Sequence, residues 1–133
     1  MITRKPAILV VDDDRMIRES LAAALFDAGY TVRLAIDGVS ALGELRDFEP
    51  DVLLSDLDMP GMGGCELLSI VRRRFPAIRS VAMSGAYWSN EVPPGIAADA
   101  FYAKGSHPPS RLFEILAALA WPGHASSIQH ESC

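Results

Sequence analysis

Hydrophobic residues in this chain gather in five short runs, which are separated by longer stretches of mixed polarity. The runs are rich in Val, Ile, Leu and Ala, a composition typical of buried strands in a parallel sheet. They cover residues Ala7–Val11, Thr31–Ala35, Asp51–Ser55, Ile78–Met83 and Ala100–Ala103. Because each interval between runs is long enough for a crossover helix, the pattern predicts a doubly wound α/β domain with helices on both faces of the sheet.

The intervals carry apolar residues at spacings of three and four, the period of an amphipathic helix. We expect Asp14 to cap the first helix and Gly29 to end it in the left-handed conformation. Pro93-Pro94 interrupts the fourth interval, so a helix there must fit roughly Ala86–Val92 and is short or absent. The residues expected to face the sheet are Ile17, Leu21, Ala24, Leu25 and Ala28; Ala41, Leu42 and Leu45; Leu67, Leu68 and Val71; and Leu112, Ile115, Leu116 and Leu119.

The length of 133 residues suits one domain with a buried core, which we place at residues 1–120, followed by a tail at residues 121–133. The net charge of −5 provides no basic field, so we expect no nucleic-acid partner. No apolar stretch approaches the roughly 20 residues of a membrane helix, and no signal peptide precedes the first run. We therefore expect a cytoplasmic protein with no membrane partner.

Polar residues follow four of the predicted strands. Asp12 and Asp13 follow the first strand, Asp56 the third, Ser84 the fourth and Lys104 the fifth. In an open parallel sheet, the ligand crevice lies beyond the carboxyl ends of the strands. This edge therefore collects carboxylates, a hydroxyl and an ammonium, a combination that suits a divalent cation and a phosphoryl group.

The acidic residues at this edge predict a cation site. If the first and third strands are neighbours, Asp12, Asp13 and Asp56 converge, and two unit charges about 4 Å apart repel by about 4 kcal/mol at an effective dielectric of 20. A proton or a cation must offset this repulsion. Oxygen ligands with no Cys or His nearby favour Mg²⁺ or Mn²⁺ over zinc. Alternatively, the acids only cap helices, a role that fits Asp14 best.

A carboxylate beside a bound cation can attack phosphorus and form an aspartyl phosphate. Asp56 is the candidate for this reaction, because it ends a buried strand beside the other acids. Lys104 can pair with one phosphoryl oxygen, and Ser84 can donate a hydrogen bond to another.

Taken together, these segments resemble the receiver domains of two-component response regulators over nearly the whole chain. The resemblance rests on the pair Asp12-Asp13, on SDLDMPGMGG around Asp56, on AMSG with Ser84 and on AFYAKG with Lys104. It implies a flavodoxin-like fold with strand order 2-1-3-4-5. It also implies a protein that is not an enzyme in the usual sense, since it catalyses only its own phosphorylation and dephosphorylation. The implied partners are a sensor histidine kinase or a histidine phosphotransfer protein, and a downstream protein that the sequence does not identify.

The resemblance further implies a role for each acidic residue. Asp56 would be the phospho-acceptor and a metal ligand. Asp13 would bind the metal directly, Asp12 mainly through water, and Asp58 through its backbone carbonyl.

The same resemblance implies a switch at the ends of the last two strands. Ser84 would move to the phosphoryl group at Asp56, and Phe101 would turn into the vacated space. Lys104 would pair with the phosphate. An ordinary core role for Phe101 stays open, because its inward and outward states differ only in packing.

Two departures from the family pattern leave alternatives open. Gly105 stands where the family usually has Pro, and Pro93-Pro94 interrupts the family's usual signalling face. The chain could therefore be an interaction module that works without phosphorylation. LLSDLDMP also resembles the nucleophile motif of haloacid-dehalogenase-type phosphatases, with Asp56 as nucleophile and Asp58 as acid/base. In those enzymes, however, the second acidic pair follows the nucleophile, and no cap domain fits in this length.

Overall fold

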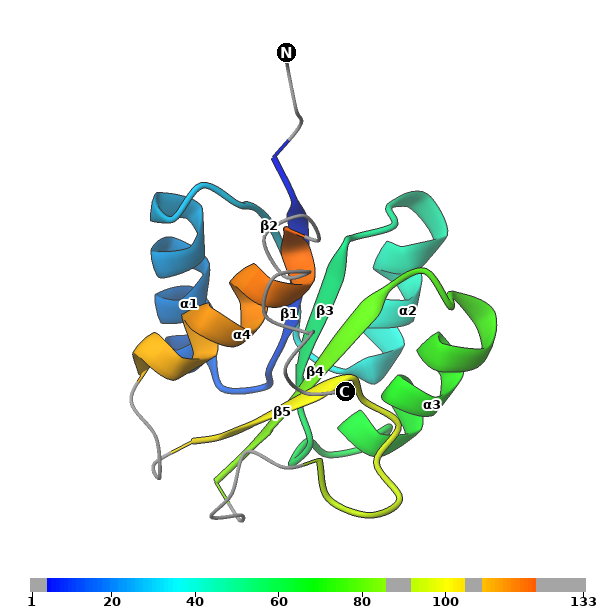
Figure 1. Ribbon diagram of the computed structural model, residues 1–133. Coiled ribbons are helices and arrows are strands. Elements are labelled where there is room, and N and C mark those ends of the chain that lie inside the picture. Colours follow the sequence, from blue (N-terminus) through cyan, green and yellow to red (C-terminus); the bar gives the residue numbers. More distant parts are fainter. Residues whose placement is uncertain (1–4, 86–91, 105–108, 122–133) are drawn as a thin grey trace, which may run out of the picture.

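The computed structural model describes residues 5–85, 92–104 and 109–121, which form a five-stranded parallel sheet with helices on both faces (Figure 1). The strands lie in the spatial order β2-β1-β3-β4-β5, which confirms the predicted fold and strand order. Their bounds are β1 Ala7–Val11, β2 Thr31–Ala35, β3 Val52–Asp56, β4 Arg79–Ser84 and β5 Ala100–Ala103.

Three strands begin and end where the hydrophobic runs predicted, but β3 and β4 each lie one residue later than expected. Sheet pairing explains the difference, because a polar residue belongs to a strand when its backbone is paired. Asp56 pairs with Met83, and Ser84 pairs with Ala103. The shift carries both polar residues into the sheet itself.

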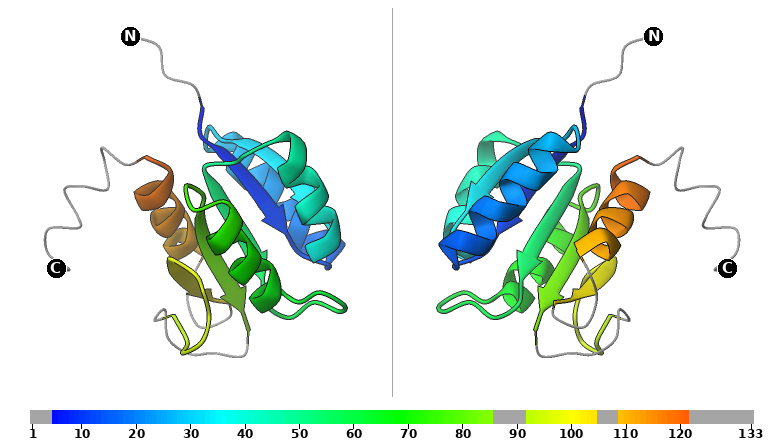
Figure 2. Two further views of the ribbon diagram at one scale, coloured as in Figure 1. Left: turned by 90° about the vertical axis from the view of Figure 1, so that its right-hand side faces the viewer. Right: turned by 90° about the vertical axis from the view of Figure 1, so that its left-hand side faces the viewer.

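The described residues form four helices, α1 (Arg15–Asp27), α2 (Gly38–Asp47), α3 (Gly64–Arg74) and α4 (Pro109–Ala120). Helices α1 and α4 cover one face of the sheet, and α2 and α3 cover the other (Figure 2). Residues 92–99, between β4 and β5, contain no helix. Most of the segment predicted for a short extra helix, together with Gly105 and residues 122–133, lies outside the described residues.

Local signals at the helix ends agree with the sequence. The side chain of Asp14 accepts hydrogen bonds from the N–H groups of Met16 and Ile17, so it caps α1 as predicted. Gly29 follows the end of α1 with φ 103°, the left-handed conformation in which glycine has no steric penalty. These ends fix α1 directly after the acidic residues that follow β1.

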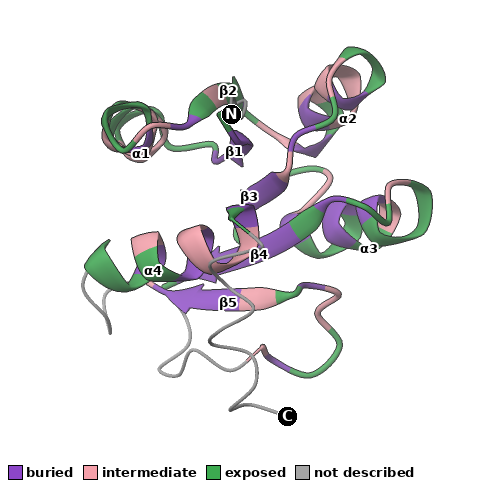
Figure 3. Cartoon of the chain, turned by 45° about the horizontal axis from the view of Figure 1, so that its top comes forward, coloured by how far each residue is buried: buried purple, intermediate pink, exposed green. Residues whose placement is uncertain are grey.

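Side chains that alternate along the strands divide the core into two layers. Leu9, Val11 and Leu53 face α2 and α3, whereas Ile8 and Val10 face α1 and α4. Strands β1, β3 and β4 are buried almost throughout (Figure 3). Asp12, Asp56 and Ser84 therefore follow or end the most deeply buried strands of the described sheet.

The predicted apolar stripe of α1 is less deeply buried than expected. Only Leu25 is fully buried in this helix, Ile17, Leu21 and Ala24 are half-buried, and Ala28 is exposed. The physical reason is that α1 packs mainly against β1 and β2. In the described part of the chain, strand β2 is the edge of the sheet, and the layer beneath the helix ends there. Among the described residues, every helix is too short or too polar to cross a bilayer.

Candidate functional site

Four of the predicted site residues lie at the carboxyl ends of neighbouring strands. Asp56 and Ser84 are the last residues of β3 and β4. Asp12 and Lys104 directly follow β1 and β5, and their backbone N–H groups donate to the carbonyl oxygens of Ala35 (3.2 Å) and Ser84 (2.9 Å). Because sheet pairing fixes the backbone at these positions, the four side chains are held at one edge, as predicted.

The carboxylates of Asp12, Asp13 and Asp56 converge at this edge. One oxygen from each residue lies within 4.8 Å of the other two. Asp12 is 0% exposed and Asp56 is 4% exposed, whereas Asp13 is exposed to solvent. Two carboxylates are thus fixed inside the protein, and the third faces the side from which an ion would enter.

Burial makes the two inner carboxylates hard to ionise. Loss of hydration raises the pKa of Asp12 above its ordinary value of 3.8, and it raises the pKa of Asp56 in the same way. Neighbouring carboxylates add to both shifts, while a backbone N–H and Lys104 oppose them. A cation among these oxygens would favour their ionised forms. The site is therefore one in which positive charge is stabilised.

One buried oxygen of Asp12 has no hydrogen-bond donor in the part of the chain that the structure describes. Oδ1 accepts from the N–H of Asp14 at 2.9 Å, but Oδ2 accepts no hydrogen bond. The ammonium of Lys104 lies 3.9 Å from Oδ2, too far for a hydrogen bond. A buried oxygen without a donor is costly, and a hard divalent cation with its water ligands can satisfy it. The residues present therefore fit Mg²⁺ or Mn²⁺.

Among the described residues, Lys104 forms ion pairs with both inner carboxylates. Its Nζ lies 3.5 Å from Oδ1 of Asp56, and its side chain is 25% exposed. A lysine ammonium has three donors and a flexible stem, so it can follow an oxygen that moves outward when a group is added to the carboxylate.

The hydroxyl of Ser84 donates a hydrogen bond to Oδ2 of Asp58 at 2.8 Å. The backbone N–H of Asp58 in turn donates to Oδ1 of Asp56 at 3.2 Å. Asp58 therefore contacts both residues that the proposed chemistry needs, one through its side chain and one through its backbone.

Phe101 is fully buried in the layer that faces α2 and α3. It pairs with Ala82 of β4, and Ala82 lies two residues before Ser84 in the sequence. The inward position is thus the one that the structure describes, and it fits a core role as well as one state of a switch.

Two contacts at the site were not predicted from the sequence. One is the hydrogen bond from Ser84 to Asp58. The sequence indicates only that Asp58 lies two residues after Asp56, which does not predict its bonding partner. The other joins Arg18 to the site, since its Nη1 donates to the backbone oxygen of Asp12 at 2.8 Å. Arg18 lies four residues after the capping Asp14, on the first turn of α1, so it is placed to reach back to the end of β1.

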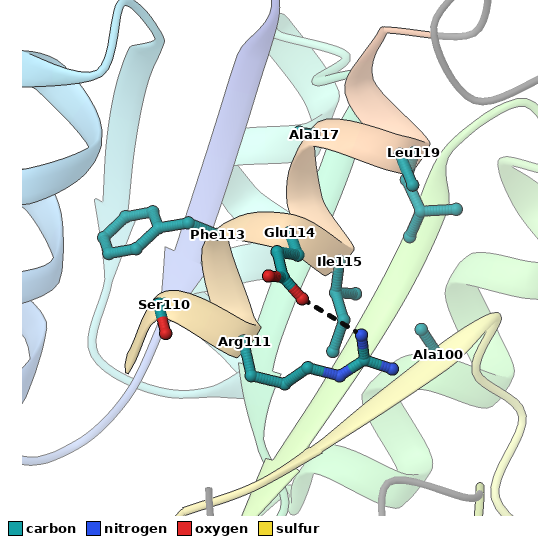
Figure 4. Close-up of a pocket in the computed structure, with 9 residues that line it drawn as sticks. Ala100, Ser110, Arg111, Phe113, Glu114, Ile115, Ala117 and Leu119 are labelled. Atoms are coloured by element: carbon teal, nitrogen blue, oxygen red, sulfur yellow. Dashed lines mark hydrogen bonds and ion pairs between the residues drawn. The ribbon is translucent and has the colours of Figure 1, made fainter. Parts of the chain in front are cut away.

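A groove on another face includes none of the acidic residues at this edge. It runs along α4 with a volume of about 710 Å³ and is lined mostly by apolar side chains, among them Ala100, Ile115 and Leu119 (Figure 4). Arg111 crosses it to pair with Glu114 at 3.2 Å. Because the charged groups of this groove pair with each other and its described residues include no cluster of carboxylates, the strand-end cluster remains the candidate reaction site.

A parallel sheet of order 2-1-3-4-5 with helices on both faces defines the flavodoxin-like class of α/β proteins, and acids, a hydroxyl and a lysine gather here at its carboxyl edge. The family model of the response regulator receiver domain matches residues 8–103, and the chain belongs to this family. It is 51% identical over 65 residues to the response regulator MprA of Mycobacterium ulcerans, a match that covers 49% of this chain and 28% of that protein. The corresponding identity with MprA of Mycobacterium tuberculosis is 49%.

Solved structures support the same assignment. The response regulator TrrA of Thermotoga maritima, crystallised in complex with Mg²⁺-BeF, is 29% identical with a TM-score of 0.77, and the match covers 86% of this chain and 98% of that one. In a second structure TrrA is bound to the histidine kinase ThkA; there the identity is 28%, the TM-score 0.72, and the coverage 83% and 95%. The fold of a receiver domain is therefore present over most of the chain.

Proposed function

We propose that this receiver domain accepts one phosphoryl group on Asp56 and passes the signal on by a change at Ser84 and Phe101. The observation that supports this most is the buried carboxylate of Asp56, which lies between two further acids and a lysine. Its Oδ1 is 3.5 Å from Lys104 Nζ and belongs to the same site as Asp12 and Asp13.

The reaction is a direct transfer. A carboxylate oxygen of Asp56 attacks phosphorus and forms an O–P bond, while the bond from phosphorus to the donor breaks and its electron pair leaves with the donor. The leaving group is the imidazole of a phosphohistidine or, with a small donor, acetate. Lys104 and Ser84 offer an ammonium and a hydroxyl to the phosphoryl oxygens, which carry the charge in the transition state.

Four residues would hold the metal that this transfer needs. Asp13 and Asp56 would bind it through carboxylate oxygens, Asp58 through its backbone carbonyl and Asp12 mainly through water. When bound, Mg²⁺ or Mn²⁺ neutralises charge on the phosphoryl oxygens. The donorless Oδ2 of Asp12 supports this arrangement, as does the Mg²⁺-BeF complex of TrrA.

The test is phosphorylation by acetyl phosphate in the presence of Mg²⁺. Intact mass should show one added phosphate on the wild-type protein, and none on Asp56→Asn or after EDTA treatment. Asp51→Asn is the matched control, since Asp51 lies at the opposite end of β3, and it should be modified like the wild type. Absence of the adduct from the wild type with every small donor and with a phosphohistidine donor would refute the proposal.

A second experiment separates a phosphorylation switch from a passive interaction module. Heteronuclear spectra are recorded with Mg²⁺, before and after beryllofluoride is added. A switch predicts shift changes around Phe101, inside β5, in addition to those at Ser84 and Lys104 beside Asp56. Changes confined to the immediate neighbours of Asp56 would support the passive interaction module.

The phosphatase alternative has no support from the family match. A lack of p-nitrophenyl phosphate turnover would exclude it.

The proposed phosphoryl donor is a sensor histidine kinase or a histidine phosphotransfer protein, and the solved complex of TrrA with ThkA supports it. The proposed location is the cytoplasm. We further propose that residues 1–120 form the receiver domain, which catalyses only its own phosphorylation and dephosphorylation.

A further inference from the structure

The hydroxyl of Ser84 is already engaged in this structure. It donates to Oδ2 of Asp58 at 2.8 Å, a short bond between a buried hydroxyl and a carboxylate. A serine hydroxyl carries a single proton, so it cannot donate to Asp58 and to a phosphoryl oxygen at Asp56 together. The two partners therefore compete for one donor.

We propose that Asp58 is a positioning residue that holds Ser84 in the unphosphorylated state and so opposes the switch. This inference rests on the proposed function, because it requires Ser84 to bond a phosphoryl group on Asp56. It assigns to the Asp58 side chain a role separate from the metal-ligand role proposed for its backbone carbonyl.

Phosphorylation would itself weaken this restraint. The N–H of Asp58 donates to Oδ1 of Asp56 at 3.2 Å, so the Asp58 carboxylate belongs to a residue in direct contact with the acceptor. A phosphoryl group adds about −1.5 to −2 charges at that position. Repulsion then moves the carboxylate of Asp58 away at the moment when Ser84 gains a new acceptor.

The local structure allows this movement. Asp58 is exposed and belongs to the loop between β3 and α3, whereas Ser84 is buried and is paired in the sheet. The loop can therefore yield more readily than the strand. Because Asp58 is partly hydrated, we expect its restraint to change an equilibrium by about five- to tenfold, less than a fully buried charged hydrogen bond would.

A double-mutant cycle tests the proposal, with the affinity for beryllofluoride at saturating Mg²⁺ as the measurement. The four proteins are wild type, Asp58→Ala, Ser84→Ala and the double variant. Both alanine substitutions keep the backbone carbonyls. Asp58→Ala should bind about five- to tenfold more tightly than the wild type, and the same substitution in the Ser84→Ala background should change the affinity by less than about twofold.

A third substitution separates the hydrogen bond from charge. Asp58→Asn removes the charge but keeps an oxygen that can accept from Ser84, so its affinity should lie between those of the wild type and Asp58→Ala. The amide resonance of Ser84 in the unliganded protein should move in Asp58→Ala and stay near its wild-type position in Asp58→Asn.

Two outcomes would overturn this inference alone. An equal gain from Asp58→Ala in both backgrounds would show that Asp58 acts only by repelling the anion. Equal affinities of wild type and Asp58→Ala would show no restraint. If the wild type binds no beryllofluoride and takes no phosphate from acetyl phosphate, the proposed function fails and this inference fails with it.

Discussion

Lys104 and Asp56 pair across an intervening strand: Nζ of Lys104, which follows β5, lies 3.5 Å from Oδ1 of Asp56 at the end of β3. Strand β4 lies between them in the sheet. The ion pair therefore connects Asp56 at the end of β3 with the end of β5, although these two strands are not paired with each other. A group added to the Asp56 carboxylate must change this pair, so Lys104 is placed to detect the modification.

Replacing Lys104 by Met should slow phosphorylation by acetyl phosphate about tenfold or more, because the phosphoryl oxygens lose a charged donor. The rate is followed by intact mass at fixed Mg²⁺. Lys5→Met makes the same charge change on an exposed residue next to Phe26, remote from the acids, and should leave the rate within about twofold. Equal slowing in both variants would indicate a general charge effect and not a contact at the site.

Asp12→Asn should stabilise the protein when no divalent cation is present. The substitution removes one of three converging negative charges, and we expect the free energy of unfolding to rise by about 1–2 kcal/mol. Urea unfolding with EDTA measures it. Glu49→Gln, on an exposed loop residue, should stay within about 0.5 kcal/mol of the wild type. Excess Mg²⁺ should reduce or reverse the difference in unfolding free energy between Asp12→Asn and the wild type, because it stabilises the wild type by binding the carboxylates. A destabilised Asp12→Asn in EDTA would contradict this account.

The raised pKa values of Asp12 and Asp56 predict a pH dependence with a definite sign. Between the ordinary value of 3.8 and the raised pKa, the folded state binds more protons than the unfolded state. The contribution of these groups to stability therefore falls as the pH rises through this window, and the cost of the buried charges is complete above it. Urea unfolding in EDTA at several pH values measures the slope, which should be shallower in Asp12→Asn/Asp56→Asn. If the unfolding free energy of the wild type instead rose relative to that of the double variant as the pH increases through this window, the prediction would be wrong.

Mg²⁺ affinity should follow the opposite course, because the ion binds the ionised carboxylates. It should increase with pH through the same window and become constant above the raised pKa. Titration calorimetry at several pH values would measure this, with Mg²⁺-dependent proton release as a second readout. A pH-independent affinity across the window would contradict the assignment of these acids to the metal.

Gly64→Ala tests the close packing between α3 and the acceptor strand. A Cβ at this position would collide with the backbone oxygen of Asp56 and lie 2.8 Å from Leu57 Cα. We expect a loss of about 1–3 kcal/mol in unfolding free energy and slower phosphorylation, since the backbone of Asp56 must shift. Gly43→Ala is the control inside α2. Its nearest neighbour would be Arg46 Nη2 at 3.8 Å, so it should gain about 0.5–1 kcal/mol. Equal stability of the two variants would show that the backbone near Asp56 is not tightly constrained.

The position of the site could be predicted from the sequence because strand ends share an edge in a parallel sheet. Asp12, Asp56, Ser84 and Lys104 each follow or end an apolar run, and one topological rule brings them together. The directions of their side chains could not be predicted from the sequence. Nothing in the pattern shows that Ser84 donates to Asp58, since a serine rotamer depends on its three-dimensional neighbours.

The helices show where periodicity reaches its limit. Leu67, Leu68 and Val71 of α3 are buried as expected, because α3 packs over central strands. Ile17 and Leu21 of α1 have the same spacing yet stay half-buried beside the edge strand. Periodicity tells which side of a helix faces inward, whereas the depth of burial depends on how much sheet lies underneath. The sequence alone does not provide that extent.

Strand β5 has four residues and is the last strand of the sheet that the described residues form, next to β4. Asp56, the proposed acceptor, ends β3, which is paired with β1 on one side and with β4 on the other. The proposed phosphorylation would therefore take place at the end of a strand that is paired on both sides, whereas Lys104, which contacts the same carboxylate, follows a strand farther out in the described sheet. Under this proposal, a change of a few atoms on Asp56 would alter the margin of the sheet while the central strands keep their conformation.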